Sequence, residues 1–200
     1  MMELKLPTEQ QLRAVYERDL KRAFPLAELK PLREMLAEVA RGEYRPWCLF
    51  DGDEIVGEAF VWTHVPGYAL FDYLCVTPAR RNDGLGSLLI EKLVEAERGN
   101  VLFGESEIPA YAADPAMAER RLGFYRRNGA QRASYDTCEF GVPYHTLYWA
   151  EGAVDAAALC AAHAACYRSS LPKPLYDRYI SIPWEPSMGV PKKIPWLGQD

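Results

Sequence analysis

The apolar residues of the first forty positions recur at the spacing of two amphipathic helices. A short strand is predicted at Glu3–Leu6, and Thr8–Phe24 follows with a helical repeat in which Thr8 is the expected N-cap. Pro25 interrupts this repeat, and a second helical pattern extends from about Leu29 to Ala40. We therefore expect two helices before the first long strand.

A period of two then replaces the helical period. The stretches Trp47–Phe50 and Ile55–Trp62 are predicted to form a hairpin through a tight Asp51–Asp53 turn. A third strand at Ala69–Val76 should end before Pro78, because proline cannot donate to a continuing ladder.

Helices and strands alternate in the rest of the chain. The expected elements are a helix from Gly84 to near Gly99, a strand beginning at Val101–Phe103, a helix at Pro115–Arg127, and a hairpin of Ala130–Phe140 with Tyr144–Trp149. Beyond Gly152 an alanine-rich helix is predicted at Val154–Tyr167, and Leu171–Asp200 is rich in prolines and aromatic residues such as Trp196. The fold class is therefore mixed α/β. We expect a domain at 1–150 and a C-terminal extension at 151–200, which packs on the domain or on a second subunit, so a homodimer stays open.

Composition and charge mainly exclude classes of protein. The 200 residues are 49% hydrophobic and can bury a sizeable core, and 23 Lys and Arg against 28 Asp and Glu give no general attraction to nucleic acid or anionic lipid. The N-terminal stretch lacks the apolar core of a signal peptide and no later run reaches transmembrane length, so we expect a soluble cytoplasmic protein without nucleic-acid or membrane partners. The 5 cysteines lack paired short spacings and are expected to be reduced thiols.

The segment Val76–Ser87 lies between a predicted strand and a predicted helix. Free backbone N–H groups and the positive end of the helix dipole converge at such a place and favour a phosphate. Gly84 and Gly86 allow the backbone to approach an anion or to adopt positive φ, and Arg80 or Arg81 adds positive charge. The segment is therefore a candidate pyrophosphate site.

Two common phosphate motifs do not fit this segment. The dinucleotide pattern fails because Leu89 stands where a third glycine belongs, and the Walker pattern fails because no Lys-Ser or Lys-Thr follows the glycines. The pattern that fits is the Arg/Gln-x-x-Gly-x-Gly/Ala signature of the GNAT acetyltransferases, here Arg81–Gly86, preceded by Leu74-Cys-Val-Thr-Pro78. Further on, the stretch Arg120–Ala130 resembles the later helix of that family, with Ala130 in place of the usual phenylalanine.

The resemblance spans roughly residues 45–150 and implies a GNAT fold, a twisted mixed central sheet flanked by helices. It also implies acetyl-CoA as cosubstrate, with the pyrophosphate on the backbone of Asn82–Ser87 and the pantetheine along Leu74–Val76 in a splayed gap between strands. The implied cofactor-binding residues are Leu74, Cys75, Val76, Arg81, Asn82, Asp83, Gly84, Leu85, Gly86 and Ser87.

Acetyl transfer to an amine needs a neutral nitrogen, a site for the oxyanion of the tetrahedral intermediate and a proton for the departing thiolate. Glu105 is the first candidate for accepting the amine proton and Glu107 is close behind, although both also fit exposed charges at a strand end. Tyr125 matches the family tyrosine that donates a proton to the leaving sulfur; the alternative is a ring that packs beside Phe124. Cys75 in a buried strand is expected to pack as a small apolar residue, which favours direct attack over a covalent acyl-enzyme.

The segment Cys160-x-x-His163-x-x-Cys166 offers three metal-ligating side chains, but helical spacing spreads them over a wide arc and no fourth ligand is evident. We therefore predict core packing and no metal.

The predicted activity is N-acetyl transfer to a primary amine of a small molecule or peptide. The rival is a non-catalytic acyl-CoA-binding sensor or assembly module. The acceptor stays open, and Asp72 and Asp114 could attract a cationic amine or be ordinary surface residues.

Overall fold

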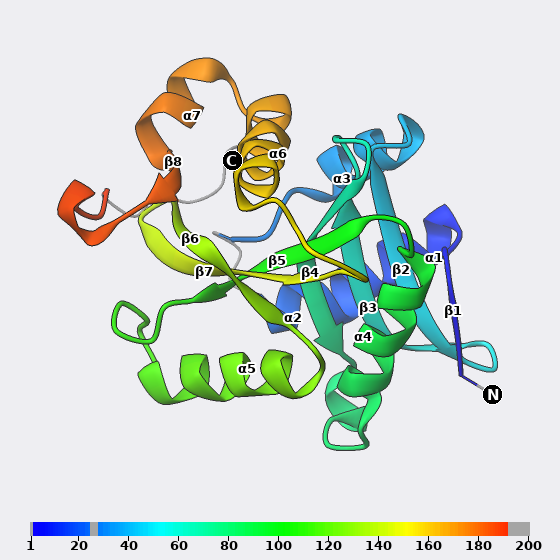
Figure 1. Cartoon of the computed structure of the whole chain (residues 1–200). Helices are drawn as coiled ribbons and strands as arrows, with labels where there is room; N and C mark the ends of the chain where they lie inside the picture. Colours follow the sequence, from blue (N-terminus) through cyan, green and yellow to red (C-terminus); the bar gives the residue numbers. More distant parts are fainter. Residues whose placement is uncertain (1, 25–27, 192–200) are drawn as a thin grey trace. The chain divides into compact units, whose positions relative to one another are not determined.

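The computed structural model describes residues 2–24 and 28–191, so Pro25 and Trp196 lie outside the described residues. The chain forms two compact units: the first holds the described residues up to Thr63 together with Phe71–Arg98, and the second holds His64–Leu70 and the described residues from Gly99 onward. Both units combine strands with helices (Figure 1), which confirms the mixed α/β class. Within the described ranges, no helix has the length and apolar character needed to cross a membrane.

The first unit is built on four neighbouring strands. Their order in the sheet is β1 (Met2–Lys5), β2 (Tyr44–Asp51), β3 (Glu54–Trp62) and β4 (Tyr68–Val76), with β4 entering this unit at Phe71. Strand β2 pairs antiparallel with both β1 and β3. Gly52 has a φ of +61° in the turn between β2 and β3, so the predicted hairpin is confirmed.

The helices of the first unit follow the predicted pattern with two changes. They are α1 (Glu9–Val15), a π-helical turn at Tyr16–Leu20, α2 (Lys21–Ala23), α3 (Leu32–Ala40), a 3-10 turn at Pro78–Arg80 and α4 (Leu85–Ala96). Thr8 caps α1 in a capping box, as expected, but the π-helical turn was not predicted. Helix α3 begins at Leu32 rather than Leu29, because a residue before a proline, here Lys30 before Pro31, avoids the helical conformation. Helix α4 packs on β1 and β3.

A buried lysine organises one end of the first unit. Lys30 is 1% exposed, and its Nζ lies 2.7 Å from Glu38 Oε2, 3.7 Å from Asp72 Oδ2 and 3.8 Å from the centre of the Trp62 ring. Burial lowers the pKa of Lys30, while the two carboxylates oppose this shift. Burial raises the pKa of Asp72 to about 7 against the effect of Lys30. Asp72 is therefore a half-buried partner of Lys30.

A second buried acid lies on β3. Glu58 is 0% exposed, and the Cys75 thiol donates a hydrogen bond to Glu58 Oε2 at 3.0 Å. Its other oxygen lies 3.9 Å from Arg18 Nη2, beyond hydrogen-bond distance. Burial raises the pKa of Glu58 to about 8; the thiol hydrogen bond lowers it and the negative charge of Asp19 adds to the rise. The folded chain therefore holds a proton on Glu58 in a pH range where an unfolded chain would release it.

The second unit contains an antiparallel sheet with the order β5 (Val101–Glu107), β7 (Val142–Trp149), β6 (Gln131–Glu139) and β8 (Ile180–Trp184). Its helices are α5 (Pro115–Arg127), α6 (Ala156–Ser170) and α7 (Lys173–Tyr179), with a 3-10 turn at Pro186–Met188. Strand β8 and helix α7 occupy the proline- and aromatic-rich segment, where the sequence pattern predicted no element. The boundary of the predicted domain at residue 150 stays a prediction.

Helices α5 and α6 cover opposite faces of this second sheet (Figure 1). Leu102 pairs with Trp149 across the ladder, so both project to one face while Phe103 projects to the other. Trp149 contacts the Tyr125 ring of α5, and Phe103 contacts the His163 ring of α6. The predicted alanine-rich helix thus packs directly on the sheet, within the second unit.

The buried Glu58 makes stability depend on pH in a defined direction. Its folded pKa of about 8 lies above the unfolded value of about 4.3, so the folded state binds the extra proton and the free energy of unfolding falls as pH rises between these values. We expect wild type to lose about 2 kcal/mol more than Glu58→Gln between pH 6 and pH 8, at about 1.4 kcal/mol per proton and pH unit. Urea unfolding at both pH values measures the difference. Glu54→Gln, at an exposed position of the same strand, is the control, and equal losses in wild type and Glu58→Gln would contradict the assignment.

Candidate functional site

The predicted phosphate loop has the backbone of an anion site. Strand β4 ends at Val76, and the chain reaches α4 through Asn82 and Gly84, whose φ values are +72° and +77°. Gly84 is the N-cap of α4 and offers no side chain to the first turn, so the backbone N–H groups there receive no side-chain cap. These N–H groups and the helix dipole form a positive site at the start of α4.

The two arginines of the loop differ in their partners. Arg80 donates to Asp83 at 3.0 Å and to Asp51 at 3.4 Å, so its charge is already balanced. Arg81 is exposed and forms no ion pair with any other residue in the described ranges. The sequence left the choice between them open; the geometry favours Arg81 as the side chain available to an external phosphate.

The predicted cofactor strand presents a buried cysteine between two half-buried residues. Leu74 and Val76 are partly exposed, whereas Cys75 points inward to Glu58. Burial, with the nearby Glu58 carboxyl, raises the pKa of the Cys75 thiol well above its usual range. Such a thiol is a poor nucleophile at neutral pH. All five cysteines are free, as predicted.

The catalytic candidates lie in the second unit, whereas all the predicted cofactor residues lie in the first. Glu105 projects from β5 towards α6, where His163 Nε2 lies 2.7 Å from Glu105 Oε1. The Tyr167 hydroxyl donates to both Glu105 oxygens, at 3.1 Å and 2.9 Å. Glu107, two residues further on, is half-exposed and lies 3.5 Å from the Arg121 guanidinium. The two glutamates therefore have different surroundings, which the sequence alone could not separate.

Tyr125 is buried in α5. It is 6% exposed, and its ring centre lies 5.9 Å from that of Trp149 and 5.4 Å from that of Phe124. Burial raises the pKa of the Tyr125 phenol, and the positive charge of Arg121 partly offsets this shift. The phenol is therefore protonated at neutral pH, as an acid must be, and it also packs beside Phe124 as the alternative reading expected.

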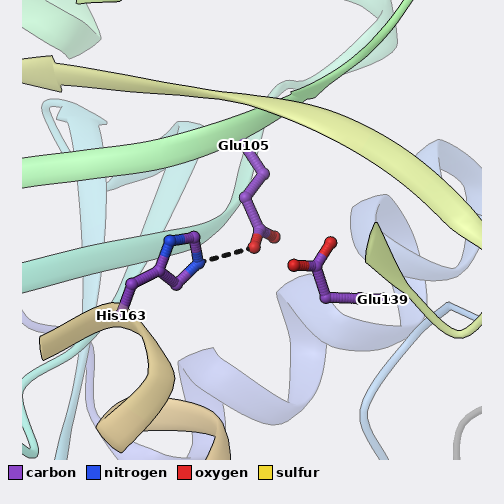
Figure 2. Close-up of side chains that lie close together, drawn as sticks. All are labelled: Glu105, Glu139 and His163. Atoms are coloured by element: carbon purple, nitrogen blue, oxygen red, sulfur yellow. Dashed lines mark hydrogen bonds and ion pairs between the residues drawn. The ribbon is translucent and has the colours of Figure 1, made fainter. Parts of the chain in front are cut away.

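A third acid faces Glu105 inside the second unit. Glu139, at the end of β6, is 4% exposed, and neither of its carboxylate oxygens has a hydrogen-bond partner among the described residues. Figure 2 shows its carboxylate directed at that of Glu105, with the His163 imidazole beside them. Burial raises the pKa of Glu139 well above its usual range, and the negative charge of Glu105 adds to the shift.

His163 is buried, in agreement with the predicted core packing, and it contacts polar side chains of the neighbouring strands. Its Nδ1 lies 3.2 Å from the Tyr135 hydroxyl, and its Nε2 meets Glu105. Glu139 and Tyr167 were not predicted as parts of a site. The sequence singled out Glu105 as a candidate base and His163 within a ligand-bearing motif, but gave no reason to join them. Tyr167 lies one turn beyond His163 on α6, whereas Glu105 and Glu139 come from separate strands, so only the fold brings the group together.

The comparisons with known proteins agree with the loop and its surroundings. Residues 42–129 match the family model described as "Acetyltransferase (GNAT) domain". Comparison of the sequence with curated proteins found no match.

Solved structures with the same fold come from several bacteria. One, from Bacteroides thetaiotaomicron and described as a GNAT-family acetyltransferase, is 21% identical, with a TM-score of 0.65 over 83% of this chain and 94% of that chain. The ribosomal-protein-S18-alanine N-acetyltransferase of Escherichia coli is 17% identical, with a TM-score of 0.57 over 78% of this chain and 98% of that chain. The spermidine N-acetyltransferase of Vibrio cholerae, in complex with CoA and spermine, is 11% identical, with a TM-score of 0.57 over 74% and 94%.

The fold is that of the GNAT acetyltransferases, and the family resemblance indicated by the sequence is confirmed. At these identities the solved structures establish the fold alone, so the acceptor and the role of each residue have to be argued from this chain.

Proposed function

We propose that the protein is an N-acetyltransferase that moves the acetyl group of acetyl-CoA to a primary amine, on a small molecule or a peptide, by direct attack through a tetrahedral intermediate. The GNAT domain supports acyltransferase activity in general. The observation that carries the proposal is the uncapped first turn of α4, reached through Asn82 and Gly84 in left-handed conformation. A cytoplasmic location belongs to the same proposal.

The cosubstrate is proposed to bind along the family motif. Its pyrophosphate would accept hydrogen bonds from the backbone between Asn82 and Ser87, with Arg81 adding charge, and its pantetheine would follow Leu74–Val76. A backbone N–H at Cys75 or Val76 would face the thioester oxygen as the oxyanion forms. The raised thiol pKa of Cys75 supports direct attack, because a protonated thiol cannot form an acyl-enzyme efficiently.

Tyr125 is proposed as the acid that protonates the departing CoA sulfur. Its raised pKa supports this role, since the phenol carries its proton at every physiological pH. The amine proton is proposed to go to Glu105 or Glu107, which the family resemblance places at the base position. Glu105 is held by two hydrogen-bond partners, whereas Glu107 is more accessible, so both stay candidates.

The amine acceptor class is supported by two of the solved structures with the same fold. The relatives from Escherichia coli and Vibrio cholerae carry names that specify amine acceptors, a protein alanine and spermidine. Asp72 does not support a cationic acceptor, because it is half-buried and already faces the Lys30 ammonium group. Asp114 caps α5 through the backbone N–H of Met117. A panel of amines and peptides, assayed with acetyl-CoA and thiol detection, tests turnover and acceptor class together, and CoA binding without thiol release on any acceptor would favour the non-catalytic sensor instead.

Gly86→Glu should abolish CoA binding and leave the fold intact, because it adds bulk and negative charge in the first turn of α4. Calorimetry with CoA measures the affinity. Gly152→Glu is the matched control, since a Cβ at Gly152 would meet no atom within 4 Å and the position lies outside the loop. Unchanged affinity in folded Gly86→Glu would remove the main support for the proposed cosubstrate site.

Glu105→Gln should lower turnover by about 10²–10⁴ at neutral pH and by less at alkaline pH, if Glu105 is the base. An alkyl amine with a pKa of about 10 is mostly protonated at pH 7 and needs a proton acceptor, whereas alkaline solution supplies the neutral amine. Profiles of kcat/KM against pH for Glu105→Gln and Glu107→Gln measure this. If only Glu107→Gln shows alkaline rescue, Glu107 is the base, and loss without rescue in both variants argues against either role.

Tyr125→Phe should lower kcat with little change in acetyl-CoA affinity, because it removes one hydroxyl and keeps the packed ring. A thiol with a pKa of about 8.5 leaves fairly readily as a thiolate, so the loss should lie near the low end of the ~10²–10⁴ range. Because burial raises the pKa of Tyr125, the wild-type rate should fall only above about pH 10, and this limb should be absent from the variant. A variant with wild-type kcat and the same alkaline limb would make Tyr125 a packing residue.

A further inference from the structure

Three side chains from three elements of the second unit bring metal-ligating atoms together. Glu105 of β5, Glu139 of β6 and His163 of α6 each offer one ligand atom, and these atoms lie within 4.8 Å of one another (Figure 2). We propose that these three residues bind a divalent cation of the first transition series. The proposal concerns a site separate from the acetyl-CoA loop and does not require acetyl transfer.

Glu139 is the residue that points most directly to a ligand. It is 4% exposed and aimed at Glu105, yet neither carboxylate oxygen has a hydrogen-bond partner among the described residues. A buried carboxylate without a donor or a counter-charge is strongly destabilising. A cation bound between the two glutamates removes this penalty for Glu139.

The charge of the cluster matches a divalent ion. As metal ligands, two carboxylates and one imidazole would supply two negative charges, and no lysine or arginine in the described ranges forms an ion pair with Glu105 or Glu139. Two hydroxyls on the same face of the sheet, Thr137 Oγ1 and Thr146 Oγ1, are also buried without hydrogen-bond partners. The polar space under α6 therefore contains several buried oxygens that no described protein atom satisfies.

The groups behind the three ligands resemble the outer shell of a metal site. A metal-bound histidine usually donates its other ring N–H to an acceptor, and His163 Nδ1 lies 3.2 Å from the Tyr135 hydroxyl. With its proton on Nδ1, His163 can offer the lone pair of Nε2 to a cation, whereas with its proton on Nε2 the ring donates a hydrogen bond to Glu105 Oε1 at 2.7 Å. Tyr167 fixes the Glu105 carboxylate through hydrogen bonds to both of its oxygens.

One imidazole and two carboxylates form a nitrogen–oxygen ligand set, which suits zinc, iron(II) or manganese(II). Three protein ligands leave at least one coordination position for water or another ligand. A metal ion there would also hold the Glu105 carboxylate, which withdraws it from proton transfer and leaves Glu107 as the base of the proposed reaction. The cysteines of the same helix contribute no ligand to this set.

The test uses the full chain, freed of metal by a chelator and then titrated with Zn(II) in a calorimeter. We expect one ion per chain. Because loss of an outer-shell partner alone costs about 10–100-fold in metal affinity, Glu139→Gln and His163→Gln should each weaken binding by at least about 100-fold, and Tyr135→Phe by about tenfold. His145→Gln is the matched control and should bind as wild type, since His145 contacts a single carboxylate, Asp136, at 2.9 Å.

Two further measurements keep the proposal open to refutation if a variant folds poorly. Zn(II) should raise the thermal midpoint of wild type and of His145→Gln but not that of Glu139→Gln, which keeps the size of the side chain. Co(II) bound to wild type should show an absorption spectrum without a thiolate charge-transfer band. The proposal is overturned if wild type takes up no Zn(II), if both ligand variants bind as tightly as wild type, or if a thiolate band appears. None of these results depends on whether the protein binds CoA.

Discussion

Acidic side chains in the interior of the two units each need a proton, a cation or a hydrogen-bond donor, and this requirement shapes both units. In the first unit, Lys30 forms ion pairs with Glu38 and Asp72, and the Cys75 thiol donates a hydrogen bond to Glu58. In the second unit, His163 and Tyr167 form hydrogen bonds with Glu105. Glu139 has no such donor, which sets it apart from the other four acids.

The same requirement explains why the C-terminal extension belongs to the second unit. Helix α6 has an apolar, alanine-rich sequence that many surfaces could accept, but the contacts of His163 and Tyr167 with one glutamate fix its position and rotation on β5. Directional hydrogen bonds to an ionised group are stronger and more specific than apolar packing alone. Glu105, which lies within the part of the chain that matches the family model, is thus connected to a helix outside that part.

Periodicity and turn residues were sufficient to predict most of the architecture. The helix at Pro115–Arg127 and the hairpin at Asp51–Asp53 have the predicted bounds or turn, because proline, Asp-Gly and regular apolar spacing act locally. Strand β8 and helix α7 could not be predicted in the same way, since β8 depends on pairing with the distant β6. The π-helical turn after α1 likewise could not be predicted, because no local sequence pattern indicates it.

The candidate functional residues likewise fall into a part that the sequence predicted and a part that it did not. The loop before α4 could be predicted because glycines and an arginine at fixed spacing impose their geometry locally. The grouping of Glu105, Glu139 and His163 could not, because it depends on three elements meeting in space.

Asn82 and Gly84 hold the loop before α4 in left-handed backbone conformations. They are imposed when the chain folds, so the N–H groups of the first turn of α4 are oriented before any ligand arrives. An anion that binds there loses little free energy to ordering the protein, and the loop should select its ligand by shape and spacing more than by overall charge.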